Sequence, residues 1–457
     1  MKLFTQVACI FAVALLSFLS SNAQDSQDSL TPETALEGYL NNGDNMYRWE
    51  LKESYKIGTV NAYSLLLTSQ QWHEYVWTHQ LTILVPAENK YDGALLFITG
   101  GSNRKGLPNW SGQDDELTRT LSLVASKNRG IVALLKQTPN QPLAGDLTED
   151  ALISYTLHKW KEDGDYSWPL LFPMVKSAVR AMDAIQEFSK QKLQHVINRF
   201  VVSGASKRGW TTWLTGASDK RVAAIAPMVI DILNMPVNLD YQVKMWKDYS
   251  VQIEDYVKLG IPQNTGTEKG KAITTMIDPY SYRKKLTMPK MIFMGTNDEY
   301  WTVDAVKHYI DSIPGVNFIH YVPNVGHGLG DKQQALTGLS AFFGRTLAGA
   351  GYPTLEWDLA QTKKGISLKV NTSPDVLVDA ILWSTDSEDT DFRDEKWSGK
   401  SLELKKRKSA VITAAQSFPE SGYRAFYLDL KYKDPNGGEY TKSTRMFVTD
   451  NDEVFLK

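Results

Sequence analysis

The sequence has 457 residues, 42% of them hydrophobic, with 50 basic and 52 acidic side chains. A chain of this length can bury a large core and form roughly two or three domains. Because the charge is nearly balanced, the sequence has neither the basic surface of a nucleic-acid binder nor a polybasic membrane patch. We therefore expect a small-molecule or peptide ligand and no nucleic-acid partner.

The first 23 residues have the pattern of a secretory signal peptide. Lys2 precedes an apolar run from Val7 to Leu19, and small residues lead to a predicted cleavage site after Ala23. Cleavage would leave 49 basic and 52 acidic residues, a net charge of −3, and would remove Cys9, the only cysteine. The mature protein would then have no disulfide, thiol nucleophile or cysteine metal site. No later stretch has the roughly 18 consecutive apolar residues of a membrane span. We expect a secreted or periplasmic protein that does not insert into the membrane after cleavage.

The next part of the chain predicts antiparallel strands followed by a parallel sheet. Partial alternation predicts strands at Ser54 to Gly58, Tyr63 to Leu67 and Glu74 to Pro86. Fully apolar runs, typical of strands covered on both faces, follow at Ala94 to Ile98, Ile131 to Leu135, Phe200 to Ser203, Val222 to Ile230, Met291 to Met294 and Phe318 to Val322. Helices are predicted at Asp115 to Lys127, Phe172 to Leu193, Lys207 to Ala217, Val303 to Ile313 and Asp331 to Leu347. The pattern indicates an α/β fold with a mostly parallel central sheet.

Residues 231–282 form a polar and aromatic insertion of roughly 50 residues, longer than an ordinary connection. Such connections are often lids or binding elements, so we expect a helical lid over one edge of the sheet. The alternative is a helical hairpin that only packs.

The composition changes again near residue 350. Short segments that alternate apolar and polar residues recur at intervals of roughly ten to fifteen residues from there to the C-terminus. This pattern predicts an α/β domain over residues 24–350 and a small antiparallel β-sandwich over residues 351–457.

The stretch VVSGASKRGWTTWL, residues 201–214, contains a candidate nucleophile. An apolar strand ends at a glycine, Ser206 follows in the turn, and a helix is predicted directly after it. This context matches the G-x-S-x-G elbow, which exposes a serine hydroxyl above the sheet, although Arg208 stands where the second glycine is expected and Gly209 comes one residue late. Ser203, the competing hydroxyl, precedes the glycine and is expected at the end of the strand.

Two further strands end at residues that would complete a catalytic triad. Asp298 follows one strand in GTNDEYWTVDA, and His327 follows the next in PNVGHG. The chain order Ser, Asp, His is that of α/β-hydrolases. In this arrangement His327 is the general base for Ser206, and Asp298 orients the imidazole. Glu299 and Asp304 are alternatives for the acid. No H-E-x-x-H or other metal-binding spacing occurs, so we expect no metal or other cofactor.

The residues around the elbow predict the rest of the site. The oxyanion hole is expected to use the backbone N–H of Lys207 and that of Gly101 or Ser102 in the loop ITGGSNRKG. The side chains of Lys207 and Arg208 would place two cations beside the pocket and favour an acidic substrate group, unless they point into solvent or pair with carboxylates. Aromatic residues near the predicted mouth would contact the substrate or pack in the core: Trp210, Trp213, Tyr300 and Trp301.

These motifs, in this order, resemble the PhoPQ-activated pathogenicity-related protein family, whose members are secreted proteins with an α/β-hydrolase-like core. The resemblance runs from about Tyr47 to about Gly351 and rests on ITGGSN, VVSGASKRGWTTWL, APMVIDILNMP, GTNDEYWTVDA and VPNVGHG. It implies the α/β-hydrolase fold without defining the substrate. The elbow also looks like that of carbohydrate esterases acting on uronate esters. The loop GTNDEYWTVDA, which carries Asp298 and is called the acid loop below, is similar to that of prolyl-oligopeptidase-type peptidases, although no β-propeller is recognisable.

We therefore expect a serine hydrolase that uses the Ser206 triad on an ester or amide, such as a small-molecule ester, a carbohydrate ester or a peptide. One alternative is an aminopeptidase or dipeptidyl-peptidase, in which Glu162, Asp163 and Asp165 would hold the substrate amine. Another is a secreted signalling or adhesion protein that keeps the fold without turnover, because a fold alone does not define a function.

Overall fold

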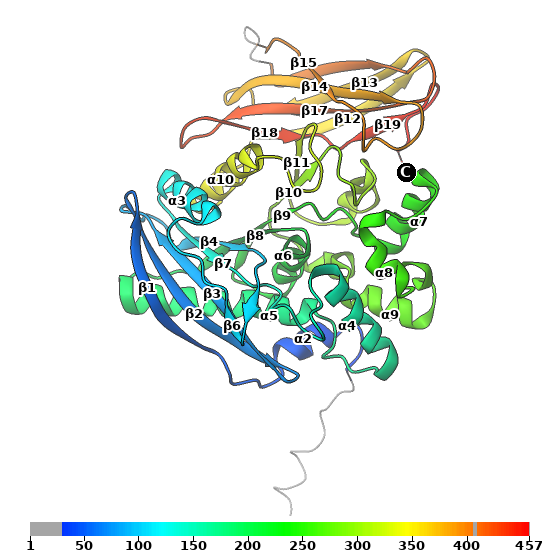
Figure 1. Ribbon diagram of the computed structural model, residues 1–457. Coiled ribbons are helices and arrows are strands. Elements are labelled where there is room, and N and C mark those ends of the chain that lie inside the picture. Colours follow the sequence, from blue (N-terminus) through cyan, green and yellow to red (C-terminus); the bar gives the residue numbers. More distant parts are fainter. Residues whose placement is uncertain (1–29, 405–408, 457) are drawn as a thin grey trace, which may run out of the picture.

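The computed structural model describes residues 30–404 and 409–456 (Figure 1). The predicted signal peptide and Cys9 lie outside these residues. Within the described ranges, no helix is long and apolar enough to cross a membrane.

A mixed sheet runs through the molecule in the strand order β1-β2-β3-β7-β4-β8-β9-β10-β11-β18-β17-β14-β15, with β19 paired to β17. Strands β1 to β3 are antiparallel, and β7, β4, β8, β9, β10 and β11 are parallel to one another. The bounds of these strands are β1 Arg48–Ile57, β2 Val60–Trp72, β3 Tyr75–Val85, β4 Gly93–Ile98, β7 Ile131–Leu135, β8 Arg199–Ala205, β9 Val222–Met228, β10 Lys290–Gly295 and β11 Asn317–Val322. The chain has the α/β-hydrolase fold, as the sequence predicted.

Helices cover both faces of the parallel strands, and β4 shows how its residues divide between them. Leu95 and Phe97 belong to one apolar cluster with α3 and α10, whereas Leu96 and Ile98 belong to another with α5 and α6. Strand side chains alternate between the two faces, so a strand covered on both must be apolar throughout. The helices of this core are α2 Ala35–Leu40, α3 Glu116–Asn128, α4 Glu149–Asp163, α5 Leu171–Phe188, α6 Lys207–Ser218 and α10 Gln333–Ala348.

Two segments differ from the predicted helices. The segment Val303 to Ile313 is not one helix but contains two short 3₁₀ turns, Ala305–His308 and Ile310–Ser312. Its side chains have separate partners: Lys307 contacts Asp304 and Tyr241, and Tyr309 contacts Asp231. Helix α4 was not predicted, although the acidic first turn after Thr148 is a typical helix start.

The insertion of residues 231–282 contains short helices, of which α8 Glu254–Lys258 contacts α4 (Figure 1). Its α-helices are α7 Met235–Trp246, α8 Glu254–Lys258 and α9 Glu268–Ile277. Its 3₁₀ turns are η2 Val251–Ile253 and η3 Pro262–Asn264, and a further turn, η4 Pro279–Lys285, begins within it.

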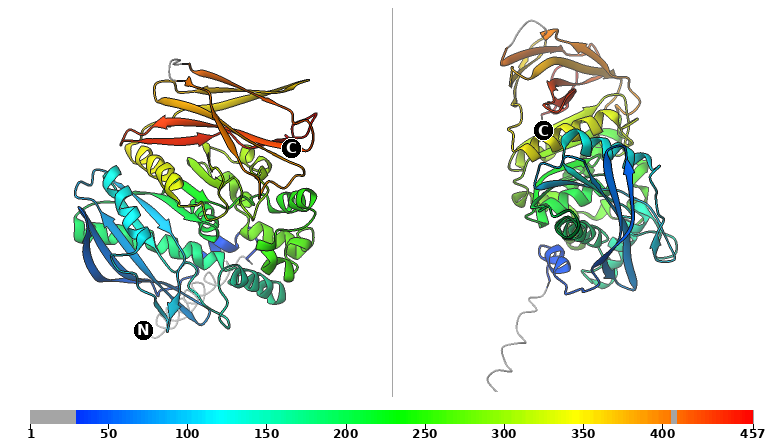
Figure 2. Two further views of the ribbon diagram at one scale, coloured as in Figure 1. Left: turned by 45° about the horizontal axis from the view of Figure 1, so that its top comes forward. Right: turned by 90° about the vertical axis from the view of Figure 1, so that its left-hand side faces the viewer.

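The C-terminal strands lie at one end of the molecule, and β1 lies at the other (Figures 1 and 2). Strands β12 Leu355–Thr362, β13 Gly365–Thr372 and β16 Val411–Ser417 form a separate antiparallel sheet. It shares an apolar cluster with β14 Leu377–Ser387, β17 Tyr423–Lys433, β18 Glu439–Ser443 and β19 Phe447–Thr449. The exposed strand β15 Ser398–Ser401 pairs with β14.

The C-terminal strands also continue the central sheet, which the sequence pattern did not predict. Strand β18 pairs with β11 at Ser443 and Ile319. Nearby, the Tyr321 N–H donates to Ser443 Oγ at 3.1 Å, and the Met446 N–H donates to the Tyr321 hydroxyl at 3.3 Å. The C-terminal strands therefore extend the α/β sheet at its β11 edge.

Candidate active site

Ser206 lies in a strained turn between β8 and α6. Its backbone has φ 58° and ψ −124°, a conformation that is rare outside glycine and typical of functional turns. A Cβ on Gly204 would lie 2.8 Å from the carbonyl oxygen of Arg208, and one on Gly209 would lie 2.6 Å from that of Met228. The glycine that comes one residue late in the motif thus allows α6 to approach β9.

The imidazole of His327 joins Ser206 to Asp298. Nε2 lies 2.9 Å from Ser206 Oγ, and Nδ1 lies 3.0 and 2.9 Å from the two carboxylate oxygens of Asp298. Because a carboxylate can only accept, the imidazole carries its proton on Nδ1 and accepts the serine hydroxyl at Nε2. This is the geometry of a nucleophile, a general base and an orienting acid.

Asp298 is almost completely enclosed, and burial raises its pKa, while the hydrogen bond to His327 acts in the opposite direction. The backbone N–H of Tyr300 donates to Asp298 Oδ1 at 2.9 Å. The Tyr300 ring stacks on the imidazole of His327 with 4.0 Å between centroids. Tyr300 in the acid loop therefore holds both the carboxylate of Asp298 and the imidazole of His327.

The alternative residues considered for the triad have other partners. Glu299 accepts the backbone N–H of His327 at 2.9 Å and does not bond its ring. Asp304 lies 2.7 Å from Lys307 Nζ. The Ser203 hydroxyl donates to the carbonyl of Ala226 on the neighbouring strand at 2.7 Å.

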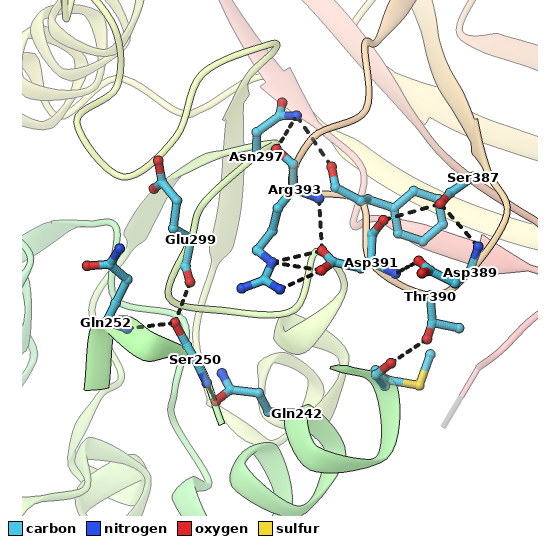
Figure 3. A network of polar contacts seen from close by, with 12 residues as sticks. Gln242, Ser250, Gln252, Asn297, Glu299, Ser387, Asp389, Thr390, Asp391 and Arg393 are labelled. Atoms are coloured by element: carbon cyan, nitrogen blue, oxygen red, sulfur yellow. Dashed lines mark hydrogen bonds and ion pairs between the residues drawn. The ribbon is translucent and has the colours of Figure 1, made fainter. Parts of the chain in front are cut away.

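The acid loop lies between the C-terminal region and the insertion (Figure 3). The side-chain amide of Asn297 donates to backbone carbonyls of the C-terminal loop at 3.3, 3.1 and 2.7 Å, those of Phe392, Arg393 and Glu395. On the other side, the Ser250 hydroxyl donates to the Glu299 carbonyl at 2.6 Å. Elements far from Asp298 in the sequence thus fix the loop that carries it.

The predicted oxyanion residues are only partly brought together. Lys207 is the first residue of α6, where backbone N–H groups lack helical partners. From the loop after β4, Thr99 and Gly100 line a cavity with Ser206 and His327, whereas Gly101 and Ser102 do not border it. The Gly101 carbonyl accepts from Gln141, and Ser102 Oγ accepts from Asn109. Neither contact involves the backbone N–H of Gly101 or Ser102, so the second oxyanion donor stays a prediction.

The cationic rim predicted from Lys207 and Arg208 is corrected by the structure. Arg208 forms a two-pronged ion pair with Glu149, at 2.7 and 2.6 Å, and its Nε donates to the carbonyl of Thr138. The ammonium of Lys207 lies 2.6 Å from Asp150. Both acids begin helix α4, which was not predicted, and pairing with carboxylates was the alternative left open for these two side chains.

The predicted aromatic residues separate into two groups. Trp210, Tyr300 and Trp301 line the cavity described below, and the Trp210 indole N–H donates to the Ile277 carbonyl at 2.6 Å. Trp213 is fully buried in the core. Only the first three are placed to contact a ligand.

Two cavities meet at Ser206. The smaller, of about 70 Å³, extends beneath the insertion and includes Asp150, Lys207 and Tyr256 in its wall. The larger, of about 280 Å³, is lined by His327, Gly100 and residues of α3 and α10. The proposed amine-binding acids Glu162, Asp163 and Asp165 border neither cavity.

The chain is similar in sequence to a known protein family and to a protein of Dictyostelium discoideum. A sequence model of the family described as PhoPQ-activated pathogenicity-related protein matches residues 36–393, a range that contains all three triad residues. Autocrine proliferation repressor protein A of Dictyostelium discoideum is 29% identical over 447 residues, covering 89% of this chain and 88% of that protein.

Solved structures align with about two thirds of the chain. Acetyl xylan esterase 1 from Thermoanaerobacterium sp. JW/SL YS485 is 17% identical over 67% of this chain and 93% of its own, with a TM-score of 0.47. Acetyl xylan esterase from Paenibacillus sp. R4 is 12% identical over 67% of this chain and 91% of its own, with a TM-score of 0.46. Acylaminoacyl peptidase of Pyrococcus horikoshii is 12% identical over 68% of this chain and 43% of its own, with a TM-score of 0.41.

Proposed function

The chain belongs to the PhoPQ-activated pathogenicity-related protein family, and from the geometry of its site we propose that it is an exported serine hydrolase that cleaves esters. The observation that carries this proposal is the imidazole of His327, which lies within 3.0 Å of both Ser206 Oγ and the buried carboxylate of Asp298. Export is supported by the signal-peptide pattern of the first 23 residues.

The arrangement supports acyl transfer to water in two steps. Ser206 Oγ attacks the ester carbonyl carbon while its proton passes to His327 Nε2, and the charge on the carbonyl oxygen is stabilised by backbone N–H groups at the start of α6. His327 then gives this proton to the leaving alkoxide oxygen as the carbon–oxygen bond breaks, which leaves an acyl-enzyme. A water molecule, deprotonated by the same imidazole, releases the carboxylic acid and restores Ser206.

We prefer ester to peptide hydrolysis because of the carboxylates near the site. A peptidase acting at a free N-terminus needs an acid to hold the substrate ammonium. In the described part of the chain, Asp150 is the only carboxylate in the wall of the smaller cavity, and it is already paired with Lys207. The acids of the segment Glu162 to Asp165 bond other groups, such as the Trp168 indole N–H and Lys159.

A fluorophosphonate probe tests the proposal, because it modifies only activated serines. We expect labelling of the wild-type protein and none of Ser206→Ala. Ser203→Ala is the matched control, since Ser203 lies three residues earlier, on strand β8, and it should be labelled like the wild type. Equal labelling of wild type and Ser206→Ala, or labelling of neither, would contradict the proposal.

A second candidate function is extracellular signalling, favoured by the relative named Autocrine proliferation repressor protein A, with which this chain shares 29% identity. Purified wild-type and Ser206→Ala proteins added to cultures of the producing cells separate the two functions. Equal repression of growth by both proteins would favour signalling without turnover, and repression by the wild type alone would connect it to hydrolysis.

A further inference from the structure

Two cavities reach Ser206 from different sides. His327 lines the larger cavity, whereas the smaller cavity reaches Ser206 from the side of the insertion. In ester hydrolysis the imidazole must protonate the leaving group, so the leaving group has to lie on the side of His327. The acyl group then occupies the smaller cavity.

We propose that the smaller cavity is an acyl pocket that selects a compact, uncharged, apolar acyl group of about four carbon atoms. This inference rests on the proposed hydrolase function and specifies its substrate class. The leaving alcohol would occupy the larger cavity, which extends toward α3 and α10.

Apolar side chains form most of the wall of the acyl pocket. Helices and turns of the insertion contribute several of them, and α6 and the acid loop contribute aromatic rings: Ile232, Met235, Ile253, Ile277, Trp210 and Trp301. Burial of an acyl chain against such a wall is favourable, because it removes apolar surface from water. The insertion therefore determines the shape of the pocket.

The polar groups of the same wall satisfy one another. Asp150 Oδ1 accepts the Tyr256 hydroxyl at 2.9 Å, and Asp150 Oδ2 lies 2.6 Å from Lys207 Nζ. Among the described residues around the pocket, Asp150 and Lys207 are the only acid and the only base. Their charges cancel, so a carboxylate or an ammonium on the substrate would lose its water without gaining a free partner. This balance favours an uncharged acyl group.

The volume of the pocket limits the length of the acyl chain. At about 70 Å³ it has about half the volume of an apolar cavity of about 150 Å³ that accommodates benzene. Room for roughly three carbon atoms follows from this comparison, which together with the carbonyl carbon held at Ser206 makes an acyl group of about four carbon atoms. A longer chain would have to displace side chains of the insertion.

A series of p-nitrophenyl esters tests both length and charge. For the wild type we expect kcat/KM to be highest for the butyryl ester and at least about 10-fold lower for the octanoyl ester. The succinyl and 4-aminobutyryl esters are close in size to butyryl but carry a carboxylate or an ammonium. We expect each to be at least about 100-fold poorer than butyryl, because its charge would be buried without a partner.

Variants of the wall test whether this cavity determines the preference. Ile277→Ala and Ile253→Ala should each shift the optimum toward longer chains and narrow the difference between butyryl and octanoyl by about 10-fold. Ile412→Ala is the control, because Ile412 is similarly buried but lies in the C-terminal sheet on β16. It should leave the chain-length profile unchanged, so an effect of lost stability alone would be recognised.

Three outcomes would overturn the assignment of the acyl pocket: preference for a charged ester, equal rates for butyryl and octanoyl esters, or a profile that neither wall variant changes. Serine-dependent labelling without hydrolysis of any of these esters would also overturn it while leaving Ser206 as a nucleophile. Failure of the proposed function itself is recognised separately, by the absence of labelling at Ser206.

Discussion

The carboxylate of Glu299 holds the backbone of His327, while the preceding residue, Asp298, holds its ring. Glu299 Oε2 accepts the His327 N–H at 2.9 Å, and a Cβ on Gly326 would lie 2.3 Å from Glu299 Oε1. The loop of the base therefore approaches the acid loop so closely that Gly326 has no room for a side chain. Asp298 thus positions the ring of His327, and Glu299 positions its backbone.

Glu299 is accordingly predicted to be a positioning residue. A hydrogen bond to a charged group contributes about 1.5 to 3 kcal/mol, so Glu299→Ala should lower kcat by roughly 10- to 100-fold. KM for p-nitrophenyl butyrate should change little, because the side chain bonds the base rather than the substrate. Glu299→Gln keeps an acceptor oxygen and should remain within about threefold of wild type. Equal losses in both variants, or a loss confined to KM, would contradict this role.

The variants Asp298→Asn and Asp304→Asn are predicted to lose different properties: the first loses activity, and the second loses stability. Asp298→Asn can leave the imidazole in the wrong tautomer, for which a loss in kcat of about 10⁴-fold is typical, with the fold retained. Asp304→Asn weakens the ion pair with the buried Lys307, and disruption of a buried pair costs about 3 to 5 kcal/mol.

Thermal unfolding and active-site titration with a fluorophosphonate separate these effects. Asp298→Asn should unfold near the wild-type temperature. Asp304→Asn should unfold earlier but keep its kcat per titrated site. The reverse result would identify Asp304 as the orienting acid.

The contact of Asn297 with the C-terminal loop is predicted to support catalysis from a distance. Asn297→Ala removes the donors to the carbonyls of that loop and frees the segment next to Asp298. We expect kcat to fall by about 10-fold, since each lost hydrogen bond costs about 1 kcal/mol, with KM nearly unchanged. Ser401→Ala is a control, because its hydroxyl bonds Asp379 within the C-terminal strands. A similar loss in the control would show that the effect is general destabilisation.

The buried aspartates Asp231, Asp278 and Asp429 are predicted to contribute a loss of stability as the pH rises from about 4 to 8. Burial raises the pKa of Asp429 to about 7, and it raises those of Asp231 and Asp278 to about 8 and about 7. An exposed aspartate in the unfolded chain has a pKa of about 3.9. Between these values the folded protein binds protons that the unfolded chain does not. Each group can therefore lower stability by up to about 1.4 kcal/mol per pH unit as its folded pKa is approached.

Asp429→Asn tests this dependence away from the candidate active site. The amide oxygen can still accept the Ser443 hydroxyl, which lies 2.5 Å from Asp429 Oδ1, but the side chain cannot ionise. The melting temperature of this variant relative to that of wild type should increase between pH 5 and 8. Asp375→Asn, at an exposed position, should keep the wild-type slope. Parallel curves for wild type and Asp429→Asn would refute the assignment.

The parts of the molecule that could be predicted from the sequence are those with local signals. Apolar runs mark the strands, and the turn after each of three strands contains Ser206, Asp298 or His327. The structure brings these three side chains within hydrogen-bonding distance, while their catalytic role remains a prediction. Strand order aligns the ends of parallel strands, so short motifs are enough to indicate such a cluster.

The features that were missed depend on partners distant in the sequence. Arg208 was expected to face a ligand or to pair with a carboxylate, and its partner Glu149, far from it in the chain, could not be identified from the sequence. An ion pair between separate helices produces no characteristic residue spacing that could be recognised in the sequence. The same is true of the junction of β11 and β18, where a single pair of residues, Ile319 and Ser443, joins two regions of different composition.

The junction of β11 and β18 has a consequence for the evolution of the chain. Recombination exchanges regions most easily when each region folds alone and meets its neighbour across a small surface. Here an exchange of the C-terminal strands would leave the edge of β11 unpaired, and an exposed strand edge invites aggregation. It would also remove the anchor of Asn297 beside the acid loop. The two regions are therefore expected to have been inherited together, so phylogenies built from either one should agree.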